Sequence, residues 1–363
     1  MDRLRIAINT GGGDAPGLNA VIHAVTMAAH QRGWEVHGIL SGYEGLLDTS
    51  KITQLTPERV QGIVAHGGTI LGTKNRGDPF RYPVPNVTGG TDLVDVSDRV
   101  VENFRRLRFD VLVAVGGDGS LTLAHQLSQK GVPVVGVPKT IDNDLALTLT
   151  TFGFDTAVST ATEAIDKLHT TAAAHERVLV VEVMGRYAGW IALHSGASGS
   201  ADVILMPEIP FDMDKVCARL TENERHGKRY GIVVVAEGAK PIGGAMVTRQ
   251  LDDKSRPEVL LGGIAEQVAR EIAKRTGKET RSMVLGHLQR GGSPTTFDRL
   301  LALRFGAAAV RFIAEGKRDV MVALQPPEMV AVPLAEVAKK TKQVDLTGET
   351  MLTCRDLGIG FGD

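Results

Sequence analysis

Cysteine is scarce in this chain of 363 residues, which has only Cys217 and Cys354, far apart in the sequence. A disulfide framework or a zinc knuckle needs closely and regularly spaced cysteines, so neither is expected. So few cysteines are typical of a protein kept in a reducing compartment. We therefore expect a cytoplasmic location.

Long apolar runs and an excess of charge of one sign are also missing. No run approaches the roughly 18 apolar residues of a spanning helix, and the short apolar stretch near the start is not typical of a signal peptide. The 41 Lys and Arg residues balance the 42 Asp and Glu residues to a net charge of −1. We expect no membrane span and no nucleic-acid partner, and any anion site must be local.

Glycine, by contrast, is plentiful, with 42 residues. Glycines allow tight turns between strands and helices and let a ligand approach the backbone closely. A chain of this length exceeds one typical core of about 100 to 200 residues. The composition therefore favours two α/β domains with ligand sites at glycine-rich turns.

The first such turn, Gly11-Gly12-Gly13-Asp14-Ala15-Pro16-Gly17, lies between a strand expected over Leu4 to Thr10 and a helix expected from about Ala20 to Gln31. A glycine turn before a helix N-terminus offers backbone N–H groups to a phosphate. It lacks the GK[ST] ending of a P-loop and a convincing G-x-G-x-x-G frame. A tight βα turn without a ligand is the alternative.

A second turn, Gly116-Gly117-Asp118-Gly119-Ser120, follows a strand expected over Val111 to Val115. Its glycines allow a nucleotide or diphosphate to approach, and Asp118 at a strand end can carry Mg²⁺ beside the phosphates. A glycine-rich turn with a capping Asp is the alternative.

Two carboxylates and a lysine lie in Pro138-Lys139-Thr140-Ile141-Asp142-Asn143-Asp144, directly after the apolar run Val132 to Val137. A Val-rich run ending in Pro predicts a buried strand leaving its sheet, and open α/β sheets bind ligands at that end. In a turning segment both acids can point into one cleft, one taking a proton and the other holding a metal. A polar turn is the alternative.

A second series of strands and helices follows a helix expected from about Phe152 to Ala174, which places a domain boundary near residue 150. Strands are expected over Arg177 to Met184, Val203 to Met206 and Gly231 to Ala236, with polar residues at their ends. A surface excursion at about 239–257 precedes a helix expected over Ile264 to Thr276.

Two arginines and a histidine surround a short strand and a glycine turn within Arg281 to Pro294. Strand alternation predicts Arg281, Met283, Leu285 and His287 on one face. Because the arginine fork suits phosphate, this face is a candidate phosphate site. Scattered surface cations are the alternative.

Six separated motifs occur in order: GGGDAPGLN, GGDGS, PKTIDND, VEVMGRYAGW, VAEG and ETRSMVLGHLQRGGSPTTFDR. On these motifs the chain resembles the phosphofructokinase family over nearly its whole length. The resemblance implies two similar Rossmann-like three-layer α/β domains with mostly parallel sheets and the active site in the cleft. It implies a donor-binding domain of residues 1–153 plus about 294–343, and a sugar-phosphate domain of 154–293 plus about 344–363.

The resemblance also assigns roles. Asp142 resembles the general base, Asp118 and Asp144 the Mg²⁺ carboxylates, and Thr140 and Arg186 the residues that contact the transferred phosphoryl group. The donor site it implies comprises Gly12, Gly13, Tyr43, Arg76, Gly116, Gly117, Asp118, Gly119, Ser120 and Lys139. Fructose 6-phosphate would contact Thr140, Asp142, Met184, Gly185, Arg186, Glu237, His287 and Arg290, with Arg177 and Arg281 from a neighbouring subunit. The resemblance thus implies a homodimer or homotetramer.

The phosphoryl donor is decided by few positions. Pyrophosphate-dependent members of the family place Asp where this chain has Gly119 and Lys where it has Lys139, whereas common bacterial ATP-dependent members have glycine at both. Gly119 leaves room for a nucleotide, which favours ATP with Mg²⁺. Lys139 fits pyrophosphate, and Leu123 replaces a glycine that lies under the adenosine in ATP-dependent relatives, so pyrophosphate remains the alternative donor.

Three other hypotheses stay open. Sedoheptulose 7-phosphate is another acceptor for the same chemistry. NAD and lipid kinases share a GGDGS-type loop, but not PKTIDND together with GHLQRGGSP. A non-catalytic sugar-phosphate sensor would not need Asp118, Asp142 and Asp144 together.

Overall fold

The computed structural model describes residues 3–74, 77–86, 89–249, 260–337 and 340–363. The chain divides into two compact units. Unit 1 comprises Met1–Thr140, Leu145–Gly153 and Arg290–Lys340, and unit 2 comprises Ile141–Asp144, Phe154–Gln289 and Thr341–Asp363. The chain therefore passes from unit 1 to unit 2 inside the segment that carries the predicted base.

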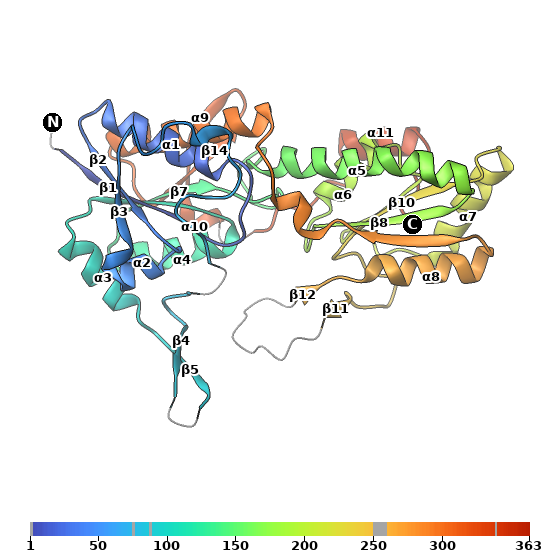
Figure 1. The fold of residues 1–363 in the computed structure, drawn as a ribbon, viewed down its shortest axis with the longest axis horizontal. Coiled ribbons are helices and arrows are strands. Elements are labelled where there is room, and N and C mark those ends of the chain that lie inside the picture. Colours follow the sequence, from blue (N-terminus) through green and yellow to red (C-terminus); the bar gives the residue numbers. More distant parts are fainter. Residues whose placement is uncertain (1–2, 75–76, 87–88, 250–259, 338–339) are drawn as a thin grey trace. The chain divides into compact units, whose positions relative to one another are not determined.

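Unit 1 is built on a seven-stranded sheet, and Figure 1 shows its strands crossing the unit. The order is β15 (Glu328–Pro333), β14 (Val320–Gln325), β7 (Val134–Pro138), β6 (Val111–Gly116), β1 (Arg5–Thr10), β2 (Glu35–Ile39) and β3 (Ile52–Leu55). The five inner strands are parallel, and β3 and β15 pair antiparallel at the two edges. Strands β6 and β7 are buried throughout, as expected for Val-rich strands covered on both faces.

Helices cover both faces of this sheet, because successive apolar side chains of its strands point to opposite faces. Ile6 and Ile8 of β1 pack with Phe305 of α9, whereas Ala7 packs with Leu121 of α4. The helices of unit 1 are α1 (Leu18–His30), α2 (Glu44–Leu47), α3 (Ser97–Arg106), α4 (Asp118–Gln129), α9 (Thr296–Ala314) and α10 (Leu334–Val337), with 3₁₀ turns η1 (Thr49–Lys51) and η2 (Ile63–Ala65). A hairpin of β4 (Tyr82–Pro85) and β5 (Thr91–Val94) extends from this unit (Figure 1).

Unit 2 contains a four-stranded parallel sheet in the order β13 (Thr280–Val284), β8 (Val178–Val183), β10 (Gly231–Ala236) and β9 (Val203–Leu205). Alternate residues of β8 and β10, such as Val180 and Val233, pack with Val216 of α7 and Val268 of α8. Figure 1 shows α5 and α6 on the opposite side of the sheet from α8. The remaining elements are α5 (Phe154–His175), α6 (Trp190–Ser198), α7 (Met213–Arg225), α8 (Ile264–Thr276), α11 (Glu349–Asp356), the pair β11 (Thr248–Arg249) and β12 (Leu260–Leu261), and the 3₁₀ turn η3 (Gly286–Arg290).

A buried acid fixes the start of α8 against the sheet. Glu182 in β8 is 2% exposed. It accepts hydrogen bonds from the backbone N–H groups of Gly263 and Ala265, at 3.0 Å each. The helix N-terminus supplies the donors and the dipole that make a buried carboxylate tolerable here.

The predicted strands β1, β6, β7, β8 and β10 are confirmed, and α8 has the predicted bounds. The predicted alternation from Arg281 to His287 is wrong beyond Val284. Strand β13 ends there, Gly286 has a φ of 49°, and His287 lies in η3. Part of the predicted excursion at 239–257 lies outside the described residues. Among the described helices, none is both long and apolar enough to cross a membrane.

Candidate active site

The first glycine turn packs too tightly for side chains. A Cβ atom on Gly11 would lie 2.6 Å from Ser120 Oγ, and one on Gly13 would lie 2.7 Å from an Arg290 guanidinium nitrogen. Gly12 has a φ of 74°, which favours glycine. The turn is joined to β6 by a hydrogen bond from Gly11 N–H to Val115 O at 2.9 Å.

The second glycine turn lies beside the first. A Cβ atom on Gly116 would come within 2.3 Å of Ser120 Cβ, so Ser120 packs directly against the glycines. The Tyr43 hydroxyl donates to Ser120 O at 3.1 Å, and burial raises the pKa of Tyr43. Asp118 and Gly119 are exposed in the first turn of α4. No atom lies within 4 Å of a Cβ built on Gly119, so the loop is open at that position.

Lys139 ties the two glycine turns together. It is 3% exposed at the end of β7, and its Nζ donates to Gly13 O. Its backbone N–H donates to Gly116 O at 2.9 Å. Arg290 NH1 donates to Asp14 O at 3.1 Å, which places this predicted sugar-phosphate ligand beside the first turn in unit 1. Gly117, whose Cβ would lie 3.2 Å from Lys139 O, completes this group.

Three further positions were singled out in the sequence analysis: Arg76, Leu123 and Thr140. Arg76 lies outside the described residues. Leu123 is half-buried on α4 and packs against the core cluster on that face of the sheet. Thr140 is the last residue of this part of unit 1, and its carbonyl oxygen accepts a hydrogen bond from Thr151 Oγ1 at 2.7 Å.

The predicted base and metal ligand lie in unit 2, in what we call the acid segment (Asp142–Asp144). Asp142 and Asp144 are half-buried, and Asn143 between them is 4% exposed with a left-handed φ of 52°. Lys342 Nζ donates to Asn143 Oδ1 at 2.8 Å, and Lys342 N–H donates to Asp144 O at 2.8 Å. Burial lowers the pKa of Lys342 to about 8, against the opposing charge of Asp144, which raises it.

The predicted sugar-phosphate residues Met184, Gly185, Arg186 and Glu237 gather at the carboxyl ends of β8 and β10. Gly185 has a φ of 133°, and Gly238 N–H donates to its carbonyl oxygen at 3.1 Å. A Cβ on Gly238 would lie 1.9 Å from Arg186 O. The two turns therefore touch, and both glycines are needed for this approach.

Gln289 is a site residue that the sequence did not reveal. Its side chain is fully buried; Oε1 accepts from Met184 N–H at 3.3 Å, and Nε2 donates to Gly286 O at 3.1 Å. Gln289 thus fixes η3, which carries the exposed His287, against the Met184 turn. Its position between the predicted ligands His287 and Arg290 was the only signal in the sequence.

Arg177 and Arg281 lie at the amino ends of β8 and β13 in the unit 2 sheet. Met184 and Glu237 lie at the opposite, carboxyl end of this sheet. Both pair with Glu279 Oε1, at 3.5 and 3.1 Å. Arg177 immediately precedes β8, whereas Met184 follows it. Six residues of strand span about 20 Å, so these two arginines cannot join Met184 and Arg186 in one small site of the same unit.

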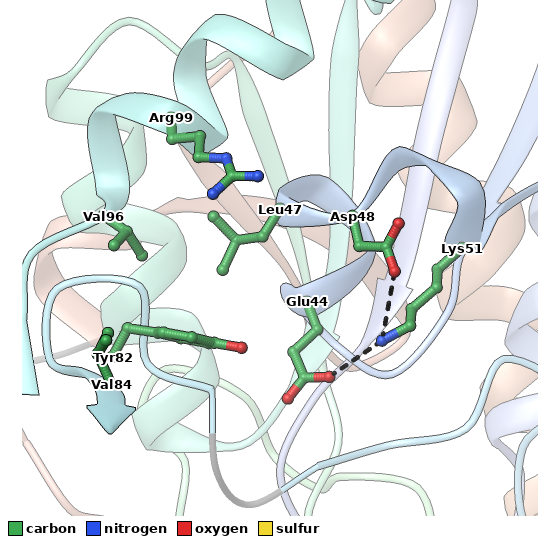
Figure 2. Close-up of a pocket in the computed structure, with 8 residues that line it drawn as sticks. All are labelled: Glu44, Leu47, Asp48, Lys51, Tyr82, Val84, Val96 and Arg99. Carbon is green, nitrogen blue, oxygen red and sulfur yellow. Dashed lines mark ion pairs between the residues drawn. The ribbon is translucent and has the colours of Figure 1, made fainter. Parts of the chain in front are cut away.

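A separate cavity of about 250 Å³ lies in unit 1 between α2, α3 and the β4–β5 hairpin. Figure 2 shows Tyr82 and Arg99 facing it, with Lys51 placed near Glu44 and Asp48. Lys51 Nζ lies 3.6 and 3.7 Å from these two carboxylates. The lining residues differ from the predicted site residues, so this hollow is not the candidate active site.

Carboxylates available for a metal are sparse. Across the parts of the chain that the structure describes, no three His, Cys, Asp or Glu side chains form a metal-binding group. Mg²⁺ commonly takes only one or two protein carboxylates and completes its shell with phosphate oxygens and water. Asp118 and Asp144 are the carboxylates that the sequence analysis predicts for Mg²⁺.

Comparison with known proteins gives consistent matches. The sequence profile described as Phosphofructokinase matches residues 5–313. The ATP-dependent 6-phosphofructokinase of Chloroflexus aurantiacus is 49% identical over 99% of this chain and 98% of its own. The pyrophosphate–fructose 6-phosphate 1-phosphotransferase of Streptomyces coelicolor is 48% identical over 99% of this chain and 100% of its own. The structure resembles Pichia pastoris phosphofructokinase in the T-state, with a TM-score of 0.78 and 32% identity over 93% of this chain and 36% of that one.

Proposed function

Because the chain belongs to the phosphofructokinase family, we propose that it transfers a phosphoryl group from ATP to the 1-hydroxyl of fructose 6-phosphate. The products are ADP and fructose 1,6-bisphosphate, and the reaction is the committed step of glycolysis. The observation that carries the proposal is the match, along nearly the whole chain, to relatives named ATP-dependent 6-phosphofructokinase.

Asp142 acts as the general base. Its carboxylate takes the proton of the sugar 1-hydroxyl as that oxygen attacks the γ-phosphorus, and the bond to ADP breaks. Thr140 and Arg186 contact the transferred group, and Arg186 stabilises its charge. Positioning and charge stabilisation of this kind account for most of the catalysis in phosphoryl transfer. Met184, Gly185, Glu237, His287 and Arg290 bind fructose 6-phosphate.

Asp118 and Asp144 hold Mg²⁺ in this proposal. Both offer the hard oxygen ligands that Mg²⁺ prefers, and two carboxylates suffice when phosphates supply further ligands. Bound Mg²⁺ neutralises phosphate charge. Gly12, Gly13, Gly116, Gly117, Ser120 and Lys139 bind the donor phosphates, and the open position at Gly119 leaves space for a nucleotide.

Pyrophosphate is the competing donor. One relative, at 48% identity, is named for pyrophosphate, whereas relatives at 49% identity are named ATP-dependent. The geometry around Gly119 favours ATP, because a carboxylate there would repel the α-phosphate. Lys139 and the half-buried Leu123 favour pyrophosphate. Sedoheptulose 7-phosphate is an alternative acceptor for the same chemistry.

Self-association completes the site in this proposal. Arg177 and Arg281 lie at the sheet end away from Met184 and Arg186, so they serve the site of a second copy. The edge strand β13 supports this, since Met283 and Val284 are 40% and 49% exposed. Exposed apolar side chains on an edge strand favour burial by another chain.

The test is a donor comparison with fructose 6-phosphate at matched free Mg²⁺. We expect kcat/KM to be much larger with ATP than with pyrophosphate. A larger value with pyrophosphate would establish the competing function, and turnover with neither donor would overturn the proposal. NAD in place of the sugar tests for an NAD kinase, and binding without turnover would identify a sensor.

A further inference from the structure

The backbone conformation of the acid segment depends on Asn143. Asn143 adopts a left-handed φ of 52°, while Asp142 and Asp144 on either side carry the proposed base and metal ligand. Asn is among the few residues with a side chain that tolerate this region. The acid segment lies outside the helices and strands, so contacts from elsewhere must hold its shape.

Lys342 supplies two such contacts from the C-terminal part of unit 2. Its Nζ donates to the Asn143 side chain at 2.8 Å, and its backbone N–H donates to the Asp144 carbonyl at 2.8 Å. One residue therefore holds both the side chain at the left-handed position and the main chain directly after it. Hydrogen bonds with a charged donor are the stronger kind.

Lys342 is itself held in place. Its carbonyl oxygen accepts from Trp190 Nε1 at 3.0 Å, and its Nζ lies 5.6 Å from the centre of the Trp190 ring. Two residues further on, Val344 N–H donates to Glu208 Oε1 at 3.0 Å, and the same oxygen accepts from Gly189 N–H at 3.0 Å. The C-terminal segment is thus tied to the start of α6, just after the turn that carries Arg186.

We propose that Lys342 is a positioning residue that holds Asp142 and Asp144 in their working geometry through Asn143 and the Asp144 main chain. The inference rests on the proposed function. Misplacing a catalytic group by about 1 Å can cost about 100-fold in rate, so loss of this contact should lower kcat. Substrate KM values should change little, because Lys342 acts through Asn143 and the Asp144 main chain.

The test compares Lys342→Met with the matched control Lys228→Met. Lys228 is another lysine of unit 2 that lies near an aromatic ring, 4.9 Å from the centre of the Tyr230 ring. Its Nζ pairs with the buried carboxylate of Asp202 at 2.5 Å. We expect Lys342→Met to lower kcat by about 10- to 100-fold, whereas Lys228→Met stays within about 2-fold. Lys342→Arg, which keeps a charged donor, should recover part of the loss.

Hydrogen–deuterium exchange gives a second readout that does not need turnover. Amides of residues 141–145 in the substrate-free protein should exchange faster in Lys342→Met than in wild type, and at the wild-type rate in Lys228→Met. If Lys342→Met does not fold, Asn143→Gly replaces it, because glycine keeps the left-handed backbone but removes the acceptor. The same faster exchange and lower kcat are expected.

The inference is overturned if kcat and exchange both stay at wild-type values in Lys342→Met, or in Asn143→Gly when that variant replaces it. It is also overturned if Lys228→Met causes equal losses, since the effect would then be general destabilisation. Failure of the proposed function looks different. The wild type would turn over no fructose 6-phosphate with ATP, and the exchange comparison would still decide the role of Lys342.

Discussion

Lys139-Thr140 and Asp142–Asp144 are separated by one residue, yet they belong to different units and are held in different ways. The first pair continues the buried strand β7, and Lys139 is bonded to both glycine turns of unit 1. The acid segment lies outside the described helices and strands, and Lys342 contacts it from the C-terminal part of unit 2. Lys139 and Thr140 are thus placed by their own strand, whereas the acid segment with the proposed base is contacted from the distant C-terminal segment.

The largest expected effect comes from a substitution in the acid segment. Asp142→Ser removes the proposed base and should lower kcat by about 10² to 10⁴, with KM values little changed. Steady-state kinetics with both substrates measures this. Asp166→Ser changes an exposed acid of α5 and should leave kcat near the wild-type value. A kcat that survives Asp142→Ser would show that the base lies elsewhere.

A smaller effect is expected at the open position of the donor side. Gly119→Asp should lower kcat/KM for ATP by about 10- to 100-fold through repulsion of the phosphates. Thermal stability should hold or rise, because a side chain there meets no neighbour and glycine is a poor helix former. The matched variant Gly119→Asn adds similar bulk without the charge. If both variants lose activity equally, crowding rather than charge is the cause.

A substitution of Lys139 should weaken binding of the phosphoryl donor and leave binding of the sugar phosphate unchanged. Lys139→Met keeps the buried stem but removes the ammonium, so KM for the donor should rise by about 10-fold while KM for fructose 6-phosphate changes little. Lys130→Met, which removes a unit 1 lysine paired with Asp98 at 2.8 Å, is the control. A rise in the sugar KM of equal size would contradict the division between donor and sugar sides.

The smallest expected effect concerns the stability of α6, which carries Trp190 and His194. Burial lowers the pKa of His194 from its ordinary 6.5, so the unfolded chain binds this proton more readily than the folded protein. The stability contributed by neutral His194 is present above about pH 6.5 and is lost as the pH falls towards the lowered value. Thermal midpoints should therefore fall less between pH 7 and 5 in His194→Gln than in wild type. Parallel curves would contradict this sign.

Much of the fold was predictable because Val-rich runs between glycines and prolines give strands, as in β6, β7, β8 and β10. Helix α9 was not predicted, although Thr295 caps it by accepting a hydrogen bond from Asp298 N–H at 3.2 Å. That Thr-x-x-Asp spacing was the available signal. Strands β14 and β15 followed no motif and were missed.

The site was predictable only where motifs carry it. Met184 to Arg186 and Glu237 gather because their strands are neighbours in a parallel sheet. Lys342 is one of three lysines in Lys339-Lys340-Thr341-Lys342, 199 positions from Asn143 in the sequence, and Gln289 is a single glutamine. Such long-range polar contacts leave no local pattern, so only the fold reveals them.

The most direct test of the central claim is ³¹P NMR of wild-type protein with ATP, Mg²⁺ and fructose 6-phosphate. We predict that fructose 1,6-bisphosphate appears at the rate at which ADP forms, with the new phosphate on the 1-hydroxyl. ADP formation without a bisphosphate product, or a bisphosphate formed only from pyrophosphate, would contradict it.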